Sequence, residues 1–256
     1  KYSINILNIY ILCILLYFPI NIYAGYQFNY IDIIKDIFIN GTFYHLWYFP
    51  ALILGLWIIY FLLKKLKFKL VFIITIILYI IGLFGDSYYY LNSEFIINIY
   101  EKIFLIFDYT RNGLFYTPIF LLLGYCINNK KINKRKSITL FLTFYVLMLL
   151  EGIILHKYNL QRHDSMYIML LPTMYYLFNF LINYKTENVK CRNIATIIYI
   201  FHPFIIVAIR FIAKIFNIEY LIVYNNLIHY IIVVTISIIL AIIIEKVKDK
   251  KKFTRN

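Results

Sequence analysis

Cysteine and acidic residues are scarce in this chain, and each shortage excludes a class of protein. The 256 residues include three cysteines and 12 aspartates and glutamates, against 26 lysines and arginines. Cys13, Cys126 and Cys191 lie in or next to apolar stretches, so we expect neither a disulfide framework nor a zinc site. The sequence also lacks a glycine-rich phosphate loop, internal repeats and low-complexity linkers. We therefore expect no metal centre and no soluble domain.

The shortage of acidic residues leaves a formal net charge of +14. A protein that binds nucleic acid gathers its lysines and arginines on one face. Here they are divided among several loops, so nucleic acid is not an expected partner. The charge instead carries information about membrane topology.

Long apolar stretches are what the chain has in abundance. Hydrophobic residues make up 63% of it and its mean hydropathy is +0.76, which is too apolar for a soluble globular domain. A membrane-spanning helix needs about 20 predominantly apolar residues. The stretches near this length are 4–24, 46–63, 68–84, 111–127, 137–155, 166–183, 194–213 and 227–244. The sequence predicts an all-α, polytopic transmembrane helix bundle of about eight spans, with a membrane domain at 1–245 and a basic tail at 246–256.

The basic residues also predict the orientation of the chain, because lysine and arginine collect in cytoplasmic loops. They collect here after the second, fourth and sixth apolar stretches and in the tail. These residues are Lys64, Lys65, Lys67, Lys69, Lys130, Lys131, Lys134, Arg135, Lys136, Lys185, Lys190, Arg192, Lys246, Lys248, Lys250, Lys251, Lys252 and Arg255. We therefore expect both termini in the cytoplasm and the loops near 25–45, 85–110, 156–165 and 214–226 outside.

Two of the expected outer loops contain amphipathic segments. In residues 28–40 and again in Phe95–Phe107, polar side chains fall on one side of a helix and apolar ones on the other. This pattern is typical of helices that lie flat in the membrane interface. Such helices either cap the bundle or take part in function, and the sequence favours neither.

Ionisable and aromatic side chains mark the outer start of the second stretch. His45 exchanges a proton near neutral pH, and Trp47 and Tyr48 offer faces on which a sugar ring stacks. An aromatic belt at the lipid headgroups explains the same residues without any ligand.

A second group, Asp108, Arg111 and Asn112, precedes the fourth stretch. The planar fork of Arg111 suits a carboxylate or a phosphate. Asp108 is close enough in sequence to pair with it instead. Asn112 and Gly113 are typical of a turn that enters a helix. Ligand binding and a structural role both remain open here.

A third group follows the fifth stretch. Glu151 lies at membrane depth, where a carboxylate needs a partner such as His156 or Arg162. His163, Asp164 and Ser165 have the residue types of a catalytic triad, but adjacent residues on a helix point in different directions. We therefore expect a polar cluster that holds a substrate rather than a nucleophilic serine.

A fourth position, His202, precedes Pro203 inside the seventh stretch. Proline cannot donate to the carbonyl of Tyr199, so a kink is expected. A kink beside an ionisable group at membrane depth is typical of a cavity lining. Pairing of the histidine with a neighbouring helix is the alternative.

Four strings resemble the acyltransferase-3 family of bacterial membrane acyltransferases, in the order in which the family has them. They are FYHLWYFPALILG, DYTRNGLFYTPIFLLLGY, EGIILHKYNLQRHDSMYIMLLP and IYIFHPFIIVAIR. The likeness runs from Tyr17 to about Arg210 and is greatest to the membrane domain of VanT-type serine racemases. It implies a ten-helix fold of which the first two helices, bearing an arginine and a histidine thought to serve acyl transfer, are absent here. VanT-type proteins also carry a C-terminal racemase domain.

The resemblance implies an enzyme of the bacterial cell membrane. It would move an acyl group, such as acetyl, from acyl-CoA to a hydroxyl of an extracytoplasmic carbohydrate or cell-wall precursor. His202 is then the candidate base, since no residue matches the family's catalytic helix. The residues expected to bind substrate are His45, Trp47, Asp108, Arg111, Asn112, Glu151, His163 and Asp164.

Two other functions remain open. In an L-serine uptake module of the VanT type, Arg111 would hold the carboxylate of serine, and Glu151 or Asp164 its ammonium group. A membrane scaffold without catalytic activity is the third hypothesis.

Overall fold

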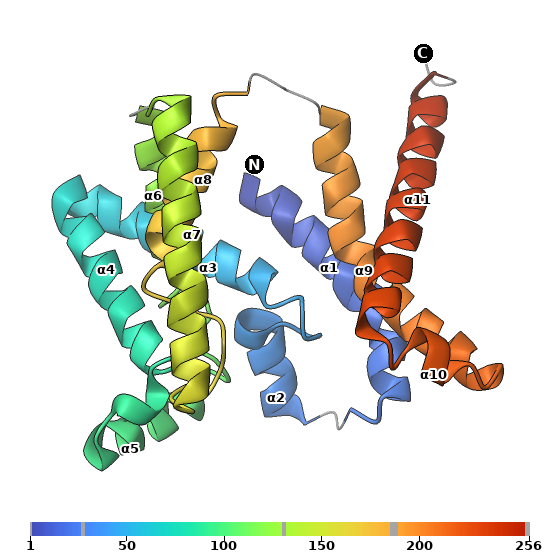
Figure 1. Ribbon diagram of the computed structural model, residues 1–256, viewed down its shortest axis with the longest axis horizontal. Helices are drawn as coiled ribbons and strands as arrows, with labels where there is room; N and C mark the ends of the chain where they lie inside the picture. Colours follow the sequence, from blue (N-terminus) through green and yellow to red (C-terminus); the bar gives the residue numbers. More distant parts are fainter. Residues whose placement is uncertain (1, 27–28, 130–131, 185–188, 254–256) are drawn as a thin grey trace. The chain divides into compact units, whose positions relative to one another are not determined.

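The computed structural model describes residues 2–26, 29–129, 132–184 and 189–253, and every regular element among them is a helix (Figure 1). The chain forms two compact units, Lys1–Lys185 and Thr186–Asn256. The predicted all-α class is therefore confirmed for the described residues. The predicted boundary between a membrane domain and a tail at residue 246 is a separate matter and stays a prediction.

The first unit contains eight α-helices and two short helical turns. The α-helices are α1 (Tyr2–Tyr23), α2 (Tyr30–Lys35), α3 (Tyr48–Lys65), α4 (Phe68–Phe84), α5 (Glu94–Phe104), α6 (Thr117–Asn129), α7 (Lys134–Lys157) and α8 (Leu170–Leu181). A π-helix, Asp36–Asn40, continues α2, and a 3₁₀ turn, Tyr89–Leu91, follows α4.

Each of the eight apolar stretches contains a helix, but only some of these helices are long enough to cross a bilayer. Five described segments qualify by length and composition, namely Ser3–Tyr23, Tyr48–Lys65, Lys134–Lys157, Lys190–Ile215 and Asn226–Lys248. The others are shorter, with 17 residues in α4, 13 in α6 and 12 in α8. The chain is thus a multi-pass membrane protein, while the count of eight spans and the cytoplasmic termini stay predictions.

Helix α6 begins later than the apolar stretch 111–127 because a turn occupies the first residues. The side-chain Oδ1 of Asn112 accepts hydrogen bonds from the backbone N–H groups of Leu114 and Phe115, at 2.9 and 3.0 Å. These bonds compete with helix formation in the way that asparagine side chains commonly do. The predicted helix-entry turn at Asn112 is confirmed.

The turn before α6 packs closely against α3. A Cβ atom on Gly113 would lie 2.6 Å from Cβ of Leu54, and one on Gly55 would lie 2.7 Å from Cγ2 of Thr117. Both glycines therefore permit an approach that any larger residue would block. Further along α3 and α6, a buried cluster joins these helices to α4 and consists of Ile59, Val71 and Leu122.

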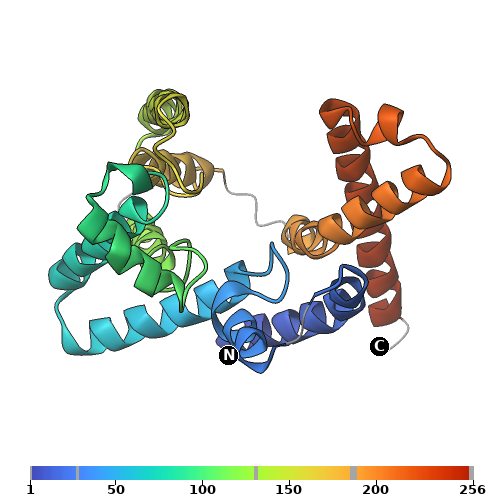
Figure 2. The same cartoon turned by 90° about the horizontal axis from the view of Figure 1, so that it is seen from below.

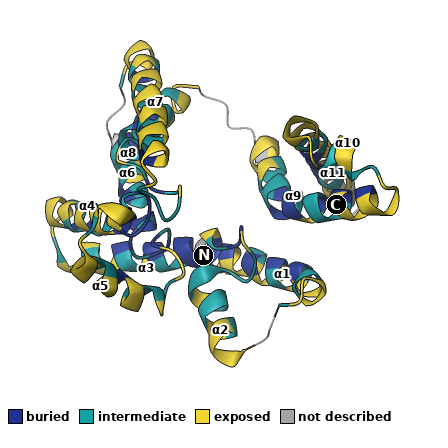
Figure 3. Ribbon diagram, turned by 60° about the horizontal axis from the view of Figure 1, so that its bottom comes forward, coloured by how far each residue is buried: buried dark blue, intermediate teal, exposed yellow. Residues whose placement is uncertain are grey.

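The surface of the first unit is strongly apolar. In α7 only 6% of the spanning window is buried inside the protein, and α7 packs mainly on α8 (Figures 1 and 3). Its exposed side chains include Leu142, Leu149 and Ile153. Such a surface suits lipid hydrocarbon and would be unfavourable in water.

Both segments predicted to be interfacial helices are helical, as α2 with its π-helix and as α5, and their place in the membrane interface stays a prediction. The expected segment 28–40 begins at Phe28, which lies outside the described residues. Nζ of Lys35 donates to the carbonyl oxygen of Leu105 at 2.6 Å, and the backbone N–H of Asp108 donates to Oδ1 of Asn40 at 3.2 Å. The two segments are thus tied together at one end of the unit.

The second unit contains α9 (Val189–Ile215), α10 (Glu219–Ile222) and α11 (Asn226–Phe253). Helices α9 and α11 lie side by side, with the short α10 touching both (Figures 1 and 2). Ile205, Ile209 and Val233 form their buried contact. Helix α11 runs to Phe253, so the first residues of the predicted basic tail are helical.

Candidate functional site

Arg111 is the centre of the polar region in the first unit. The turn before α6 holds its guanidinium 4.5 Å from the ring centroid of Trp47 and 5.6 Å from that of Tyr109. Both are cation–π distances. Its Nε atom is buried and has no hydrogen-bond partner among the described residues. The structure therefore brings Arg111 and Trp47 together and leaves donor capacity that suits an anion.

Asn112 serves the turn itself. Its side-chain amide donates to the carbonyl oxygen of Tyr109 at 2.8 Å while Oδ1 accepts the two backbone hydrogen bonds described above. Only 3% of the residue is exposed. Asn112 thus positions Tyr109 and Arg111 rather than presenting its amide to a ligand.

Asp108 and Arg111 were considered as a pair, but each has other neighbours. The backbone carbonyl of Asp108 accepts a hydrogen bond from the Arg162 guanidinium at 3.1 Å. The Arg162 side chain lies over the ring of Phe104, at 3.7 Å from its centroid. Asp108 itself is exposed at the edge of the region. Its hydrogen-bond partners are therefore Arg162 in the loop after α7 and Asn40 in the π-helix after α2.

Asp86 is a buried carboxylate that the sequence analysis missed. It lies in the turn after α4 and is 0% exposed. Its Oδ1 accepts hydrogen bonds from the backbone N–H groups of Ser165 and Met166, at 2.8 and 3.0 Å, and from the Ser87 hydroxyl at 3.0 Å. Burial raises the pKa of Asp86, while these hydrogen bonds and the charge of Arg111 act in the opposite direction.

The same turn anchors His163 near Arg111. The backbone N–H of Arg162 donates to the carbonyl of Asp86 at 3.0 Å, and the Ser87 hydroxyl lies 3.2 Å from the carbonyl of His163. The imidazole meets the Tyr109 ring edge-on, with centroids 4.6 Å apart. Burial and the charges of Arg162 and Arg111 lower the pKa of His163, so its neutral form is favoured.

Glu151 finds partners other than the expected His156 or Arg162. Its carboxylate accepts hydrogen bonds from the Tyr88 hydroxyl and from the backbone N–H of Ile168, both at 2.6 Å, and from the N–H of Met169 at 2.9 Å. These two N–H groups immediately precede α8, so Glu151 acts as a capping group for that helix. His156 instead lies 2.8 Å from the Gln161 amide through its Nδ1.

Asp164 and His45 each contact tyrosine side chains. Asp164 is exposed, and its Oδ1 accepts a hydrogen bond from the Tyr167 hydroxyl at 3.4 Å. His45 is buried, with ring centroids 4.9 Å from Tyr17 and 5.4 Å from Tyr44. The imidazole of His45 is therefore part of an aromatic contact between α1 and the segment before α3.

His202 belongs to the second unit and serves its own helix. Its Nδ1 lies 3.1 Å from the carbonyl oxygen of Ile198 and 3.0 Å from that of Tyr199. A carbonyl only accepts, so Nδ1 is the donor in these contacts. Pro203 lacks the N–H that would bind the Tyr199 carbonyl, and His202 supplies the missing donor.

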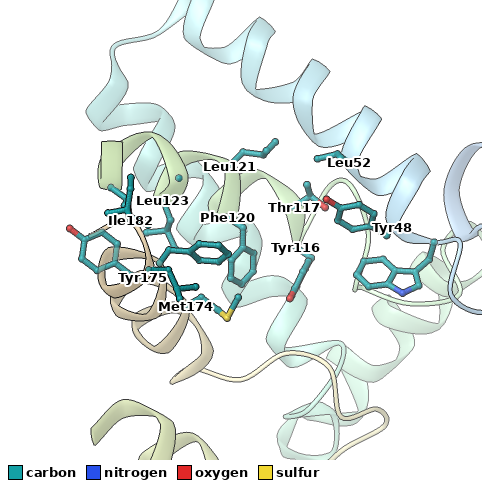
Figure 4. A pocket seen from close by; sticks show the side chains of 15 residues that line it. Tyr48, Leu52, Tyr116, Thr117, Phe120, Leu121, Leu123, Met174, Tyr175 and Ile182 are labelled. Atoms are coloured by element: carbon teal, nitrogen blue, oxygen red, sulfur yellow. The ribbon is translucent and has the colours of Figure 1, made fainter. Parts of the chain in front are cut away.

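An apolar groove of about 640 Å³ begins beside Trp47 and extends along α6. It lies between α3, α6 and α8, and Figure 4 shows their side chains. Figure 4 shows Tyr48 toward one end of the groove and Tyr175 and Ile182 toward the other. The arrangement therefore joins an arginine with unused donor capacity to a hydrocarbon-lined groove. Among the described residues, no group of three histidine, cysteine or acidic side chains is placed to hold a metal.

Asp86 and Tyr109, which the sequence analysis missed, both lie directly beside a predicted span. Asp86 follows the apolar stretch 68–84 after a single glycine, and Tyr109 precedes Arg111 by two residues. An acidic residue so close to a span end is a candidate for burial, but its partners lie about 80 positions along the chain. The sequence contains no local sign of that contact.

Comparison with known proteins gives a consistent set of matches. The family model described as an acyltransferase domain matches residues 4–246. An amino-acid racemase of Enterococcus faecalis is 40% identical over 92% of this chain, and a second one is 36% identical over 100% of it. A serine/alanine racemase of Enterococcus gallinarum is 33% identical over 91% of the chain. The matches cover 34%, 37% and 34% of these relatives, so the chain spans about a third of their length. No solved structure matches.

Proposed function

This chain belongs to the acyltransferase domain family of membrane proteins, and we propose that it binds a small amino acid, such as serine or alanine, at Arg111 and carries it across the bacterial cell membrane. The observation behind this proposal is the Arg111 guanidinium, which is fixed between Trp47 and Tyr109 with a buried Nε that has no partner among the described residues. A carboxylate is the natural counterpart of such a group.

Two facts favour an amino acid over other anions. Two relatives are named amino-acid racemases, and a third is named a serine/alanine racemase, which are names of proteins that act on amino acids. A buried acidic group, Asp86, also lies within electrostatic reach of Arg111, so a large polyanion would be repelled. Delivery of the amino acid to a racemase is the role that this combination supports.

Uptake of radiolabelled L-serine into proteoliposomes tests the proposal. Arg111→Ala should reduce the initial rate by about 10- to 100-fold, since a charged hydrogen bond contributes roughly 1.5–3 kcal/mol. Arg135→Ala removes the same charge from an exposed position at the start of α7 and should leave the rate unchanged. Equal rates in the Arg111 variant and the parent protein would exclude this role for Arg111.

Acyl transfer is the second candidate, and the acyltransferase family model favours it. In this reaction His202 would act as the base for a hydroxyl. The hydroxyl oxygen of a carbohydrate or cell-wall precursor would then attack the thioester of acetyl-CoA. An ester would form, and the coenzyme would leave as its thiol after taking up the proton.

Transfer of label from radiolabelled acetyl-CoA in membranes separates the two candidates. An acyltransferase should lose this transfer in His202→Ala and keep it in His156→Ala. An amino-acid carrier should show no acetyl transfer above background in any variant, while Arg111→Ala reduces serine uptake.

A further inference from the structure

The two oxygens of Asp86 have very different surroundings. Three donors converge on Oδ1, from Ser87, Ser165 and Met166. They fix the carboxylate in one orientation. Oδ2 is equally buried but has no hydrogen-bond partner among the described residues. A buried acceptor without a partner costs roughly 1–3 kcal/mol, and more when it is charged.

The Asp86 turn is linked to Arg111 through the loop after α7. The Ser87 hydroxyl bonds the carbonyl of His163, whose ring lies against Tyr109, and the Arg111 guanidinium lies over that same Tyr109 ring. Arg111 also acts electrostatically on Asp86, and its Nε is buried with no hydrogen-bond partner among the described residues. Two groups of opposite charge that do not satisfy each other are suited to a ligand that carries both charges. In a free amino acid, the ammonium and carboxylate groups are attached to the same carbon atom.

We infer that Oδ2 of Asp86 accepts a hydrogen bond from the ammonium group of the amino acid whose carboxylate is held by Arg111. This inference rests on the proposed function and names the residue that selects amino acids over hydroxy acids. It replaces the earlier candidates for this role. Glu151 already accepts three hydrogen bonds through its two oxygens, and Asp164 lies exposed beside Tyr167.

The burial of Asp86 has a consequence for how the ligand enters. At 0% exposure, Oδ2 is reached only after its covering groups shift. The segment Arg162–Met166 covers this turn and is fastened to it by the hydrogen bonds of Asp86 and Ser87. The bound amino acid would therefore be occluded beneath this segment, as a carrier requires between its two openings.

Competition for radiolabelled L-serine on the purified chain tests the inference without any substitution. L-Lactate has the carboxylate and hydroxyl of a small hydroxy acid but no ammonium group. We expect L-alanine to compete about 10- to 100-fold more strongly than L-lactate, from the contribution of one charged hydrogen bond. Equal competition by the two would overturn the inference, because no group would then recognise the ammonium.

Asp86→Asn tests the residue itself. Asparagine keeps an oxygen that accepts the three hydrogen bonds made to Oδ1, but it places an amide donor where Oδ2 was. We expect the preference for L-alanine over L-lactate to disappear. Ser87→Ala is the matched control, since it removes one of these hydrogen bonds and keeps the charge, and it should retain the preference.

The outcomes separate this inference from the proposed function. If the parent protein binds serine and Asp86→Asn keeps the full preference, Asp86 is not the ammonium-binding residue and the proposed function survives. If the parent protein binds no amino acid, the proposed function fails and the inference with it. Size-exclusion elution and thermal unfolding of each variant establish that a lost preference does not reflect a lost fold.

Discussion

At the scale of single residues, several polar side chains near helix ends or a proline form hydrogen bonds with the backbone. Asn112 closes the turn before α6, Glu151 caps α8, and His202 satisfies a carbonyl that proline leaves without a donor. In a membrane such backbone groups cannot hydrogen-bond to water. These side-chain hydrogen bonds therefore stabilise the fold more than they would in a soluble protein. Asn112 and Glu151 were expected to bind substrate and His202 to act as a base, and each has a structural partner.

Asn112→Ala should destabilise the first unit. The substitution removes the acceptor of two backbone N–H groups and the donor to Tyr109, so we expect a loss of about 1–2 kcal/mol, in the range of a lost helix cap. Thermal unfolding in detergent measures the change. Asn98→Ala, at an exposed position of α5, is the control and should unfold with the parent protein. A normal melting temperature for Asn112→Ala would show that the turn forms without the side chain.

His163 should make the stability depend on pH. Its pKa lies below the usual value of about 6.5, so as the pH falls the unfolded chain takes up the proton first. The contribution of neutral His163 is therefore complete above pH 6.5 and is lost progressively below it. The groups that act on the ring are Arg162, Arg111, Asp164 and the Tyr109 ring.

Melting temperatures between pH 8 and pH 5 test this dependence. The parent protein should lose more stability over this range than His163→Gln, which cannot be protonated. Parallel curves for the two proteins would mean that the imidazole titrates in the folded state as it does in water.

At the scale of elements, the effects of His202 and Pro203 on the stability of α9 should be coupled. His202→Ala leaves the Tyr199 carbonyl without its side-chain donor, at a loss of about 1 kcal/mol. Pro203→Ala restores the backbone N–H that binds this carbonyl, so the same histidine substitution should then have a smaller effect. A double-mutant cycle on chemical unfolding measures the coupling, and strictly additive effects would contradict it.

The helices themselves were largely predictable from the sequence, whereas the contacts between them were not. Each apolar stretch contains a helix, and both interfacial helices were expected, because local hydrophobicity and its period determine these elements. The starts of α6 and α8 were missed by several residues, since side-chain caps at Asn112 and Glu151 decide them. The bonds from Tyr88 to Glu151 and from Met166 to Asp86 join residues far apart in sequence, and no local pattern marks them.

The candidate site was predictable in part for the same reason. Arg111, Trp47 and His163 were chosen because charged and aromatic groups are rare beside apolar stretches, and the structure places these three around Tyr109 and Tyr116. Asp86 was missed because its burial results from packing of the loop after α7. His202 was chosen for its depth in the sequence; it belongs to the second compact unit, and its catalytic role stays a prediction.

At the scale of the whole molecule, the uneven distribution of lysine and arginine predicts an orientation that labelling can test. In a chain with Cys13, Cys126 and Cys191 replaced by alanine, a single cysteine is introduced at Glu94 or at Lys67, both exposed positions. A membrane-impermeant maleimide should label the Glu94→Cys protein in intact cells. It should label the Lys67→Cys protein only after lysis. The reverse pattern would invert the orientation and place the Arg111 region on the cytoplasmic side.

The cap that Glu151 provides for α8 has a consequence for how the chain enters the bilayer during synthesis. A 12-residue helix is too short to be retained by the translocon alone, and a carboxylate within a neighbouring span opposes its insertion. Once Glu151 of α7 accepts hydrogen bonds from the two amides just before α8, its charge is partly satisfied and the start of the short α8 is fixed. The two should therefore partition into lipid as one hairpin, and a ribosome-stalled chain that ends before residue 168 should leave α7 poorly integrated.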